Sequence, residues 1–351
     1  MLWSFSFLAD KTYAALIRRD PMRLEDLIPY CSFNSVHLSA TSKCQLKCPV
    51  CETARGFNRQ GVLGAGHLKA VELLRFLDMN PTIRKMEISH YGELFLNPEA
   101  PEIFHAAFLK NVSLTVANGV NLNFLSDEQC DALVKYRVRL LTVAIDGATP
   151  ETYAIYRRGG DFARVLENVA RINAAKKKYA SPYPELFWQF IPFAHNEHEI
   201  AAARSLASGL GMTFSVKLNA ADTYAPVKDP QRIAKEAGVI HATRKDYLAE
   251  RGRIYGLPCH QLWVSPQINW DGKLLGCCSN LFGSLGDAFE RPLEEVMQSS
   301  PVMQTKKILL GLEPVTADSP CARCYVFTEK IKDKCRVLSI IDNLFPPESR
   351  R

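Results

Sequence analysis

The chain has 351 residues, of which 47% are hydrophobic, so it can bury a large core in one large domain or two. Its net charge of +6 is a mild excess without the concentrated basic stripe of a nucleic-acid binder, because the one dense run, at residues 176–178, indicates a solvated helix end. Eleven cysteines without a secretory signal favour metal binding in a reducing cytoplasm over disulfides. The N-terminal run MLWSFSFLAD is too short to cross a bilayer and is predicted to pack on the surface, so we expect a cytoplasmic protein with no transmembrane segment.

The first two-thirds of the chain alternates predicted strands and helices. Helices are predicted at residues 68–77, 98–108, 162–176 and 197–210, and after Ser126, which is expected to form a capping box with Gln129. Strands are predicted at residues 36–40, 85–89, 113–116, 140–145, 186–191 and 214–218. Six such units imply a parallel sheet with helices outside, and they are too few to close an eight-stranded barrel. We therefore predict an α/β fold, a partial (β/α)6 TIM-like barrel.

Three cysteines follow the first predicted strand in the run CQLKCPVC, as Cys44, Cys48 and Cys51. Thiolates are soft ligands, and a tight loop of them suits an iron–sulfur cluster. Three ligands on a four-iron cluster leave one iron open for a substrate or co-substrate. The alternative is a zinc site with His37 as the nearest fourth ligand, although zinc sites usually pair two CxxC units.

A CxxxCxxC run directly after a first strand resembles the cluster loop of radical S-adenosylmethionine (SAM) enzymes, although Val50 stands where that family often has an aromatic residue. In that family the open iron binds the amino and carboxylate groups of SAM. Reduction of the cluster then cleaves SAM to a 5′-deoxyadenosyl radical, which removes a hydrogen atom from the substrate. The resemblance therefore implies a SAM-binding 4Fe–4S cluster on the three cysteines, and an electron donor such as flavodoxin or ferredoxin.

Two further motifs at the carboxyl ends of predicted strands resemble this family, at the end of a parallel barrel where chemistry takes place. The run SHYGELFLNPE contains Gly92 and Glu93 and resembles the GGE motif that binds the SAM amino group, with Tyr91 in place of the usual first glycine. The triplet at 117–119, with Asn118, is similar to the family's TNG turn near SAM and the substrate. On its own it would indicate an ordinary Asn-Gly turn.

The segment IDGATPETYAIYRRGGDF, at residues 145–162, closely resembles the segment after the fourth strand of SPASM-type radical SAM enzymes. The resemblance implies that Arg157 contacts the SAM carboxylate, which a guanidinium fork matches, and Arg158 could exchange roles with it. Asp146 could bind ribose or substrate, or cap the following turn. Gln189 could face the lumen beside SAM, or be buried and bonded to backbone, and Asn196 is predicted to cap a helix.

A second group of cysteines lies in the last third of the chain. Cys259 precedes QLWVSPQINWDGKLLGCC, in which an Asp-Gly turn predicts a hairpin that presents Cys277 beside Cys259. A CxxC pair follows in the run SPCARC, after a helix predicted around residues 293–297. This pattern resembles the SPASM/twitch module, a small β-hairpin/α domain, and implies one auxiliary 4Fe–4S cluster on Cys259, Cys277, Cys321 and Cys324.

Several alternatives stay open for this second group. Cys278 is the neighbour of Cys277 and could replace it as a ligand, and a structural zinc on the same four cysteines is possible. Only Cys335 follows the CxxC pair, so a second auxiliary cluster is not expected. Cys130 falls in a predicted helix and is expected to be simply buried.

Together these features predict a radical SAM enzyme that abstracts a hydrogen atom from a small sugar- or polyol-type metabolite, for oxidation or epimerisation. The alternatives are a peptide-modifying radical SAM enzyme, which often carries an extra domain that would not fit in the ~35 residues before the barrel, and a non-catalytic zinc- or cluster-binding interaction protein. No nucleic-acid partner is expected, and no catalytic base or hydrogen donor is assigned. The expected organisation is an N-terminal extension at 1–34, the barrel at 35–220, a linker at 221–258, the auxiliary cluster domain at 259–330, and a C-terminal helix and tail at 331–351.

Overall fold

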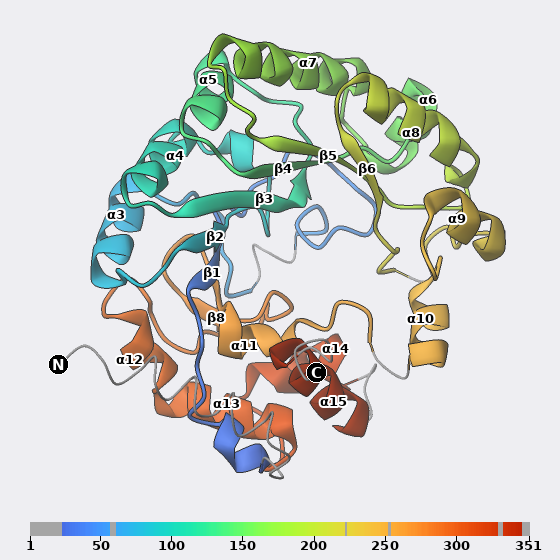
Figure 1. Ribbon diagram of the computed structural model, residues 1–351. Helices are drawn as coiled ribbons and strands as arrows, with labels where there is room; N and C mark the ends of the chain where they lie inside the picture. The colour runs from blue at the N-terminus through green and yellow to red at the C-terminus, as the bar shows by residue number, and fades with distance from the viewer. Residues whose placement is uncertain (1–22, 57–60, 222, 252–253, 329–332, 346–351) are drawn as a thin grey trace.

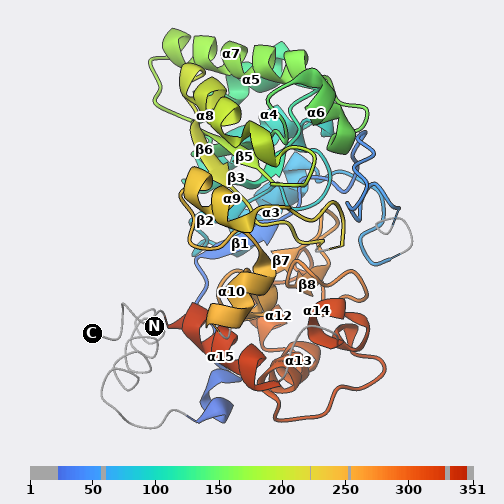
Figure 2. The same cartoon turned by 90° about the vertical axis from the view of Figure 1, so that its right-hand side faces the viewer.

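The computed structural model describes residues 23–56, 61–221, 223–251, 254–328 and 333–345. The segment MLWSFSFLAD lies outside these residues, as do most of the predicted N-terminal extension, the end of the predicted C-terminal tail and the side chain of Cys335. The described chain forms a curved sheet with helices on its outer side and a second group of short helices and loops beside the first strand (Figure 1 and Figure 2).

The sheet has six parallel strands that pair in the order of the sequence: β1 (Ser35–Leu38), β2 (Lys85–Glu87), β3 (Ser113–Val120), β4 (Leu140–Ala144), β5 (Glu185–Phe190) and β6 (Thr213–Val216). The predicted hairpin is formed by β7 (Gln267–Ile268) and β8 (Leu274–Gly276). It does not stand apart from the barrel, because β7 pairs in parallel with β1 and extends the same sheet. Within the described residues β6 and β8 are the two edges, so the predicted open, partial barrel is confirmed.

Helices that alternate with the strands cover the outer face of the sheet (Figure 1). The capping box predicted at Ser126 is present, since its hydroxyl accepts the Gln129 N–H and the Gln129 side chain accepts the Ser126 N–H. A shorter helix, α6 (Pro150–Tyr156), follows β4. The covering helices are α3 (Ala70–Met79), α4 (Ala100–Leu109), α5 (Asp127–Lys135), α7 (Phe162–Lys178) and α8 (Ile200–Gly209).

The segment predicted as a linker contains α9 (Pro230–Ala237) and α10 (Arg244–Arg251), which run from the β6 edge towards the C-terminal part of the chain (Figure 1). That part consists of short helices around the β7–β8 hairpin, and the predicted helix near residue 293 is present as α12. Its helices are α11 (Gln261–Val264), α12 (Leu293–Met297), α13 (Ser300–Leu310), α14 (Tyr325–Thr328) and α15 (Asp333–Leu344). Single 3-10 turns occur at Leu24–Leu27, Leu94–Leu96, Glu197–Glu199, Pro258–His260 and Pro320–Arg323.

One hydrophobic core runs through the sheet and into the C-terminal part. Leu141 and Thr142, which point to opposite faces of β4, are both buried, as predicted for a strand covered on both faces. Trp263 of α11 is also fully buried and donates its indole N–H to the Leu27 carbonyl at 2.8 Å, which ties the start of the described chain to the C-terminal part. None of the described helices is both long and apolar enough to cross a membrane.

Candidate active site at the carboxyl end of the sheet

The three loop cysteines lie together at the carboxyl end of β1. They share a small hydrophobic cluster with the buried side chains of Tyr156 and Phe193, whose ring centroids are 4.5 Å apart. The Cys51 N–H donates to the Cys48 carbonyl at 3.2 Å, which closes the loop into a turn. Burial raises the pKa of the Cys44 thiol to about 12 and also raises the pKa of Cys48. Metal binding would therefore have to displace thiol protons.

Gly92 allows the backbone of the loop after β2 to pack directly against the cysteine loop. Its φ is +68°, and a Cβ at this position would lie 2.6 Å from the Lys43 carbonyl oxygen, so only glycine fits the backbone here. The N–H of the next residue, Glu93, donates to the same carbonyl at 2.7 Å. The Gly-Glu pair predicted to contact SAM is thus attached directly to the residue before Cys44.

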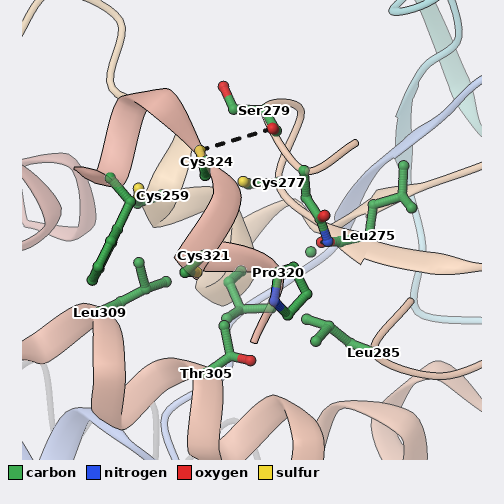
Figure 3. A pocket seen from close by; sticks show the side chains of 14 residues that line it. Cys259, Leu275, Cys277, Ser279, Leu285, Thr305, Leu309, Pro320, Cys321 and Cys324 are labelled. Carbon is green, nitrogen blue, oxygen red and sulfur yellow. Dashed lines mark hydrogen bonds between the residues drawn. The ribbon is translucent and has the colours of Figure 1, made fainter. Parts of the chain in front are cut away.

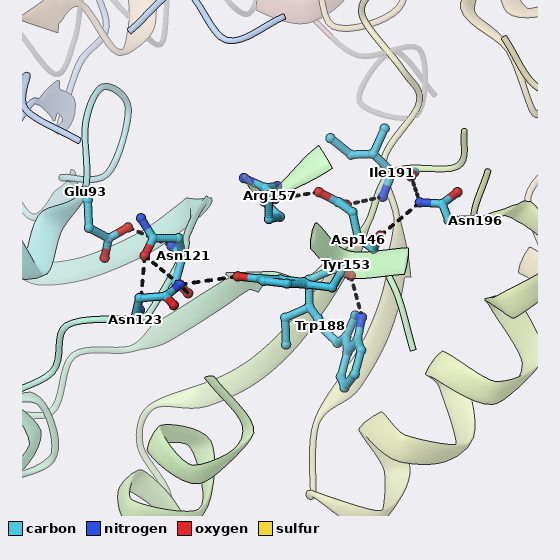
Figure 4. Close-up of polar contacts among 10 residues, drawn as sticks. Glu93, Asn121, Asn123, Asp146, Tyr153, Arg157, Trp188, Ile191 and Asn196 are labelled. Carbon is cyan, nitrogen blue, oxygen red and sulfur yellow. Dashed lines mark hydrogen bonds and ion pairs between the residues drawn. The ribbon is translucent and has the colours of Figure 1, made fainter. Parts of the chain in front are cut away.

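Glu93 is a buried carboxylate with one oxygen unused, and its side chain is only 1% exposed. One oxygen accepts the Asn121 N–H at 2.7 Å, whereas Oε1 has no hydrogen-bond partner within the described residues. Burial raises the pKa of Glu93 to about 7. Asn121, which lies beside Glu93 in Figure 4, in turn places its side-chain nitrogen 3.7 Å from the Cys44 sulfur. An unpaired buried carboxylate oxygen needs a donor, so it would accept an N–H group of a ligand beside the cysteine loop.

Arg157 and Asp146 form a buried ion pair on the other side of the loop (Figure 4). The Arg157 Nε donates to one Asp146 oxygen at 2.6 Å, and the other oxygen accepts the Ile191 N–H at 2.7 Å. Asp146 raises the pKa of the guanidinium, and the guanidinium offsets part of the rise in pKa that burial causes in Cys48. Because both Asp146 oxygens are engaged, its carboxylate positions the Arg157 guanidinium beside Cys48.

Asn196 stands at the predicted N-cap position, directly before the 3-10 turn at Glu197–Glu199, although its side chain makes no capping hydrogen bond. Its nitrogen instead donates to the carbonyl oxygens of Asp146 and Ile191, at 3.2 and 2.9 Å, and its oxygen accepts the Phe193 N–H. Asn196 therefore fixes the loop that follows β5 to the end of β4, which holds Asp146 in place.

Asn118 and Gln189 lie further along the same end of the sheet. The triplet 117–119 was predicted to be a turn after the third strand, but it lies inside β3, where the pairing with β4 is irregular. The buried carboxylate of Glu87 accepts the Ala117 N–H at 2.8 Å and the Asn118 side-chain N–H at 3.4 Å, and Gly119 has a φ of +98°. The Gln189 side chain packs over Gly119, where a Cβ would lie 3.1 Å from its nitrogen.

The four C-terminal cysteines predicted as ligands line one cavity (Figure 3). They come from the 3-10 turn at Pro258–His260, the end of β8 and the 3-10 turn at Pro320–Arg323 with the residue after it. Burial raises the pKa of each of these thiols, to about 11 in Cys321. The remaining lining is mainly apolar, with Leu262, Leu275 and Leu309 among its residues.

Cys278 does not line this cavity, so the geometry favours Cys277 as the ligand of the pair. The Cys278 N–H donates to the Gln261 side chain at 2.8 Å, and the Cys278 carbonyl accepts the Tyr91 hydroxyl at 2.6 Å. Tyr91 precedes Gly92, so this bond links the two cysteine groups. Burial raises the pKa of the Cys278 thiol to about 12.

Both cysteine groups fit iron–sulfur clusters better than zinc. Within the described residues, no three Cys, His, Asp or Glu side chains converge closely enough to hold a single metal ion. A tetrahedral zinc ion with Zn–S bonds of about 2.3 Å would bring its thiolates within about 4 Å of one another, whereas a cluster binds each thiolate at a separate iron. His37, the alternative zinc ligand, instead lies edge-on to His90 with ring centroids 6.4 Å apart.

Sequence reasoning missed Asn121 and Lys217. Asn121 stands outside every recognised motif, and only the folded chain brings it between Glu93 and Cys44. Lys217 follows β6 directly, and alternation along residues 214–218 could have indicated that it faces the lumen.

Comparison with known families agrees with this geometry. The family model of the radical SAM superfamily matches residues 38–193, and the model of the SPASM iron-sulfur cluster-binding domain matches residues 259–325. The chain belongs to the radical SAM superfamily and carries a SPASM domain. A 4Fe–4S cluster that binds SAM, SAM itself and an auxiliary iron–sulfur cluster are therefore its cofactors.

The fold is similar to solved radical SAM structures of low sequence identity. SuiB of Streptococcus suis bound to S-adenosylmethionine is 14% identical over 85% of this chain and 72% of SuiB, with a TM-score of 0.61. SuiB bound to its precursor peptide SuiA matches 93% of this chain with a TM-score of 0.60. Native anSMEcpe with bound AdoMet is 12% identical over 90% of this chain and 97% of that protein, with a TM-score of 0.53. No protein of curated function is detectably similar in sequence.

Proposed function

We propose that this protein reductively cleaves SAM and abstracts a hydrogen atom from a small metabolite of sugar or polyol type, for oxidation or epimerisation. The proposal rests on two polar side chains, one on either side of the cysteine loop, that could bind a ligand. Glu93 offers an unpaired carboxylate oxygen near Cys44, and Asp146 holds the Arg157 guanidinium beside Cys48. An amino acid moiety, with an amino group and a carboxylate, matches this pair.

The chain's own residues then have distinct roles. Cys44, Cys48 and Cys51 would hold the SAM-binding cluster, and when bound this cluster supplies the reducing electron and an open iron. Glu93 accepts an N–H of the SAM amino group, and Arg157 pairs with the SAM carboxylate while Asp146 fixes its orientation. Gly92 supplies the close backbone approach that keeps these groups together, and Asn118 and Gln189 are proposed to contact the remainder of SAM.

The C-terminal cysteines Cys259, Cys277, Cys321 and Cys324 would hold the auxiliary cluster. Four protein ligands leave no open iron, so this cluster is better suited to electron transfer than to substrate binding. We also propose that the barrel spans residues 35–220 and the auxiliary domain residues 259–330. The reductant would be a one-electron protein such as flavodoxin or ferredoxin, and the compartment is proposed to be the cytoplasm.

The second candidate function is peptide modification. SuiB was crystallised with a precursor peptide and anSMEcpe with the Cp18Cys peptide, and both share this fold, although at 14% and 13% identity they support the fold alone. Incubation with candidate peptides or with polyols and sugars separates the two functions. A true substrate raises 5′-deoxyadenosine formation above the substrate-free rate, and deuterium at its reacting carbon appears in the 5′-deoxyadenosine.

The test of SAM cleavage is anaerobic reconstitution followed by an iron count and a 5′-deoxyadenosine assay. Wild-type protein should hold about eight irons in two 4Fe–4S clusters and should form 5′-deoxyadenosine with a strong reductant. Cys48→Ala should lose about four irons and all 5′-deoxyadenosine. Cys130→Ala is the matched control, because Cys130 is buried in α5 and should change neither quantity. Zinc in place of iron, or 5′-deoxyadenosine from Cys48→Ala, would refute the proposal.

A further inference from the structure

Lys217 places a cation at the carboxyl end of β6. Its backbone N–H donates to the Phe190 carbonyl at 3.0 Å, so it continues the pairing of β6 with β5. Phe214, three residues earlier, packs on Phe190 and lies 5.1 Å from the guanidinium of Arg204 on α8, so it faces the outer helices. Side chains alternate along a strand, so Ser215 and Lys217 face the lumen.

The Lys217 ammonium has no hydrogen bond or ion pair within the described part of the chain, although its side chain is partly buried. Burial is the largest influence on Lys217 and lowers its pKa. The charged groups that affect it most are Arg157 and Arg244, which lower its pKa further, and Asp146. Asp146 is already paired with Arg157, so it does not neutralise a second cation. A cation withdrawn from water without a partner is costly unless a ligand supplies the opposite charge.

Arg244 is the second cation at this position, and it comes from a different element. It begins α10, which descends along the open side of the sheet between β6 and the C-terminal part (Figure 2). Its Nε is buried without a hydrogen-bond partner within the described residues, and its guanidinium lies 5.3 Å from the Tyr255 ring centroid. The unused Nε is an independent sign that a group able to accept hydrogen bonds belongs here.

Two neighbours on the auxiliary side interact with Lys217. They are the Cys278 thiol and His90, whose pKa burial lowers to about 3. Glu52 also affects Cys278, but its own nearest charged partner is Arg55.

We propose that Lys217 and Arg244 bind an anionic group of the substrate, a carboxylate or a phosphate, between the SAM site and Cys278. This inference rests on the proposed function and narrows its substrate to a small anionic metabolite, such as a sugar acid or a sugar phosphate. Arg157 is excluded from this role because it is assigned to the SAM carboxylate. Lys217 would anchor the substrate from β6, and Arg244 would approach it from α10.

The test is equilibrium binding of probe anions to the reconstituted, SAM-loaded full chain by titration calorimetry. The probes are inorganic phosphate and succinate, with glycerol as the neutral control. Wild-type protein should bind at least one anion saturably and should not bind glycerol. Lys217→Met should weaken anion binding by at least about tenfold, as expected for loss of a charged hydrogen bond. Lys217→Arg keeps the charge and should stay within about threefold of wild type.

Lys177→Met is the matched control, because Lys177 is exposed on α7 and far from β6 in the sequence. It should leave anion binding unchanged, and SAM affinity should be unchanged in all variants. Equal anion affinity in wild type and Lys217→Met, or no anion binding at all, would overturn the inference. A tenfold loss of SAM affinity in Lys217→Met would overturn it as well, because it would assign Lys217 to SAM. Binding needs no turnover, so failure of SAM cleavage would refute only the proposed function.

Discussion

Glu93→Gln tests the SAM site most directly, because the substitution keeps the shape of the side chain and removes only its charge. The amide oxygen of the variant side chain can still accept the Asn121 N–H, which lies 2.7 Å from Glu93 in the wild type. What is lost is the charged acceptor offered by Oε1. A hydrogen bond to a charged group contributes about 1.5–3 kcal/mol, so the Kd of SAM should rise by about tenfold to 150-fold.

The effect should depend on pH in a defined direction. With a pKa of about 7, Glu93 is about one-tenth ionised at pH 6 and about nine-tenths ionised at pH 8. The ratio of the SAM Kd in Glu93→Gln to that in wild type should therefore grow by almost tenfold between these values. Taking the ratio cancels any titration of SAM itself, since both proteins bind the same ligand.

As pH rises, Glu93 should lower the free energy of unfolding, whereas it should increase the affinity for SAM. The pKa of Glu93 is raised from 4.5 in the unfolded chain to about 7 in the fold, so the folded chain binds more protons in this window and loses stability as pH rises through it. The cost is absent below about pH 4.5 and reaches about 3 kcal/mol above pH 7. Cluster-free Glu93→Gln should therefore unfold at higher denaturant concentration than wild type at pH 8, and the difference should vanish near pH 4.5.

These measurements use SAM titrations of reconstituted protein and denaturant unfolding of cluster-free protein. The matched control is Glu99→Gln, since Glu99 accepts a backbone N–H from Ala70 in a similar way but lies at the start of α4. It should leave SAM affinity unchanged at every pH. If Glu93→Gln bound SAM as tightly as wild type, or if the Kd ratio were flat from pH 6 to pH 8, the assignment of Glu93 to the SAM amino group would be wrong.

Three further substitutions test other parts of the site. Cys277→Ser should reduce the iron content from about eight to about four, whereas Cys278→Ser should retain about eight, as measured by iron analysis; the reverse pattern would exchange the two ligands. Gly92→Ala should destabilise the fold by about 2–4 kcal/mol in denaturant unfolding, because it combines a positive φ with a backbone overlap; a neutral effect would contradict the tight loop contact. Asp146→Asn should cost about 3 kcal/mol of stability and weaken SAM binding through misplacement of Arg157, and unchanged SAM affinity would argue against that positioning role.

The parallel barrel could be predicted from sequence because its signals are local. The strands and helices follow local apolar patterns, and the capping box at Ser126 lies within four residues. The cysteine spacing likewise predicted both groups of candidate ligands without any knowledge of the fold, and the structure brings each group together. Choosing between Cys277 and Cys278 needed the structure, because adjacent residues leave the end of a strand in different directions.

The contacts that could not be predicted connect distant parts of the chain. Asn121 lies 76 residues after Gln45, whose side-chain nitrogen donates to its oxygen at 2.8 Å, and no local pattern specifies such a pair. The side-chain contacts of Asn196 were not predicted for the same reason, since one partner, the carbonyl of Asp146, follows another strand. The positions of such side chains depend on hydrogen bonds to buried backbone groups, which need partners once the sheet has formed.

The departure from the family's GGE motif at Tyr91 has a structural explanation. A glycine there could not reach the C-terminal part of the chain, whereas the Tyr91 hydroxyl donates to the carbonyl of Cys278 at 2.6 Å, next to Cys277. The following Gly92 packs on the Lys43 backbone, next to Cys44. One dipeptide therefore contacts the residue adjacent to a ligand in each cysteine group. The pairing of β7 with β1 joins the same two regions through backbone hydrogen bonds. The Tyr91 side chain, which the usual motif does not provide, thus adds a direct hydrogen bond between the loop after β2 and the C-terminal cysteine group.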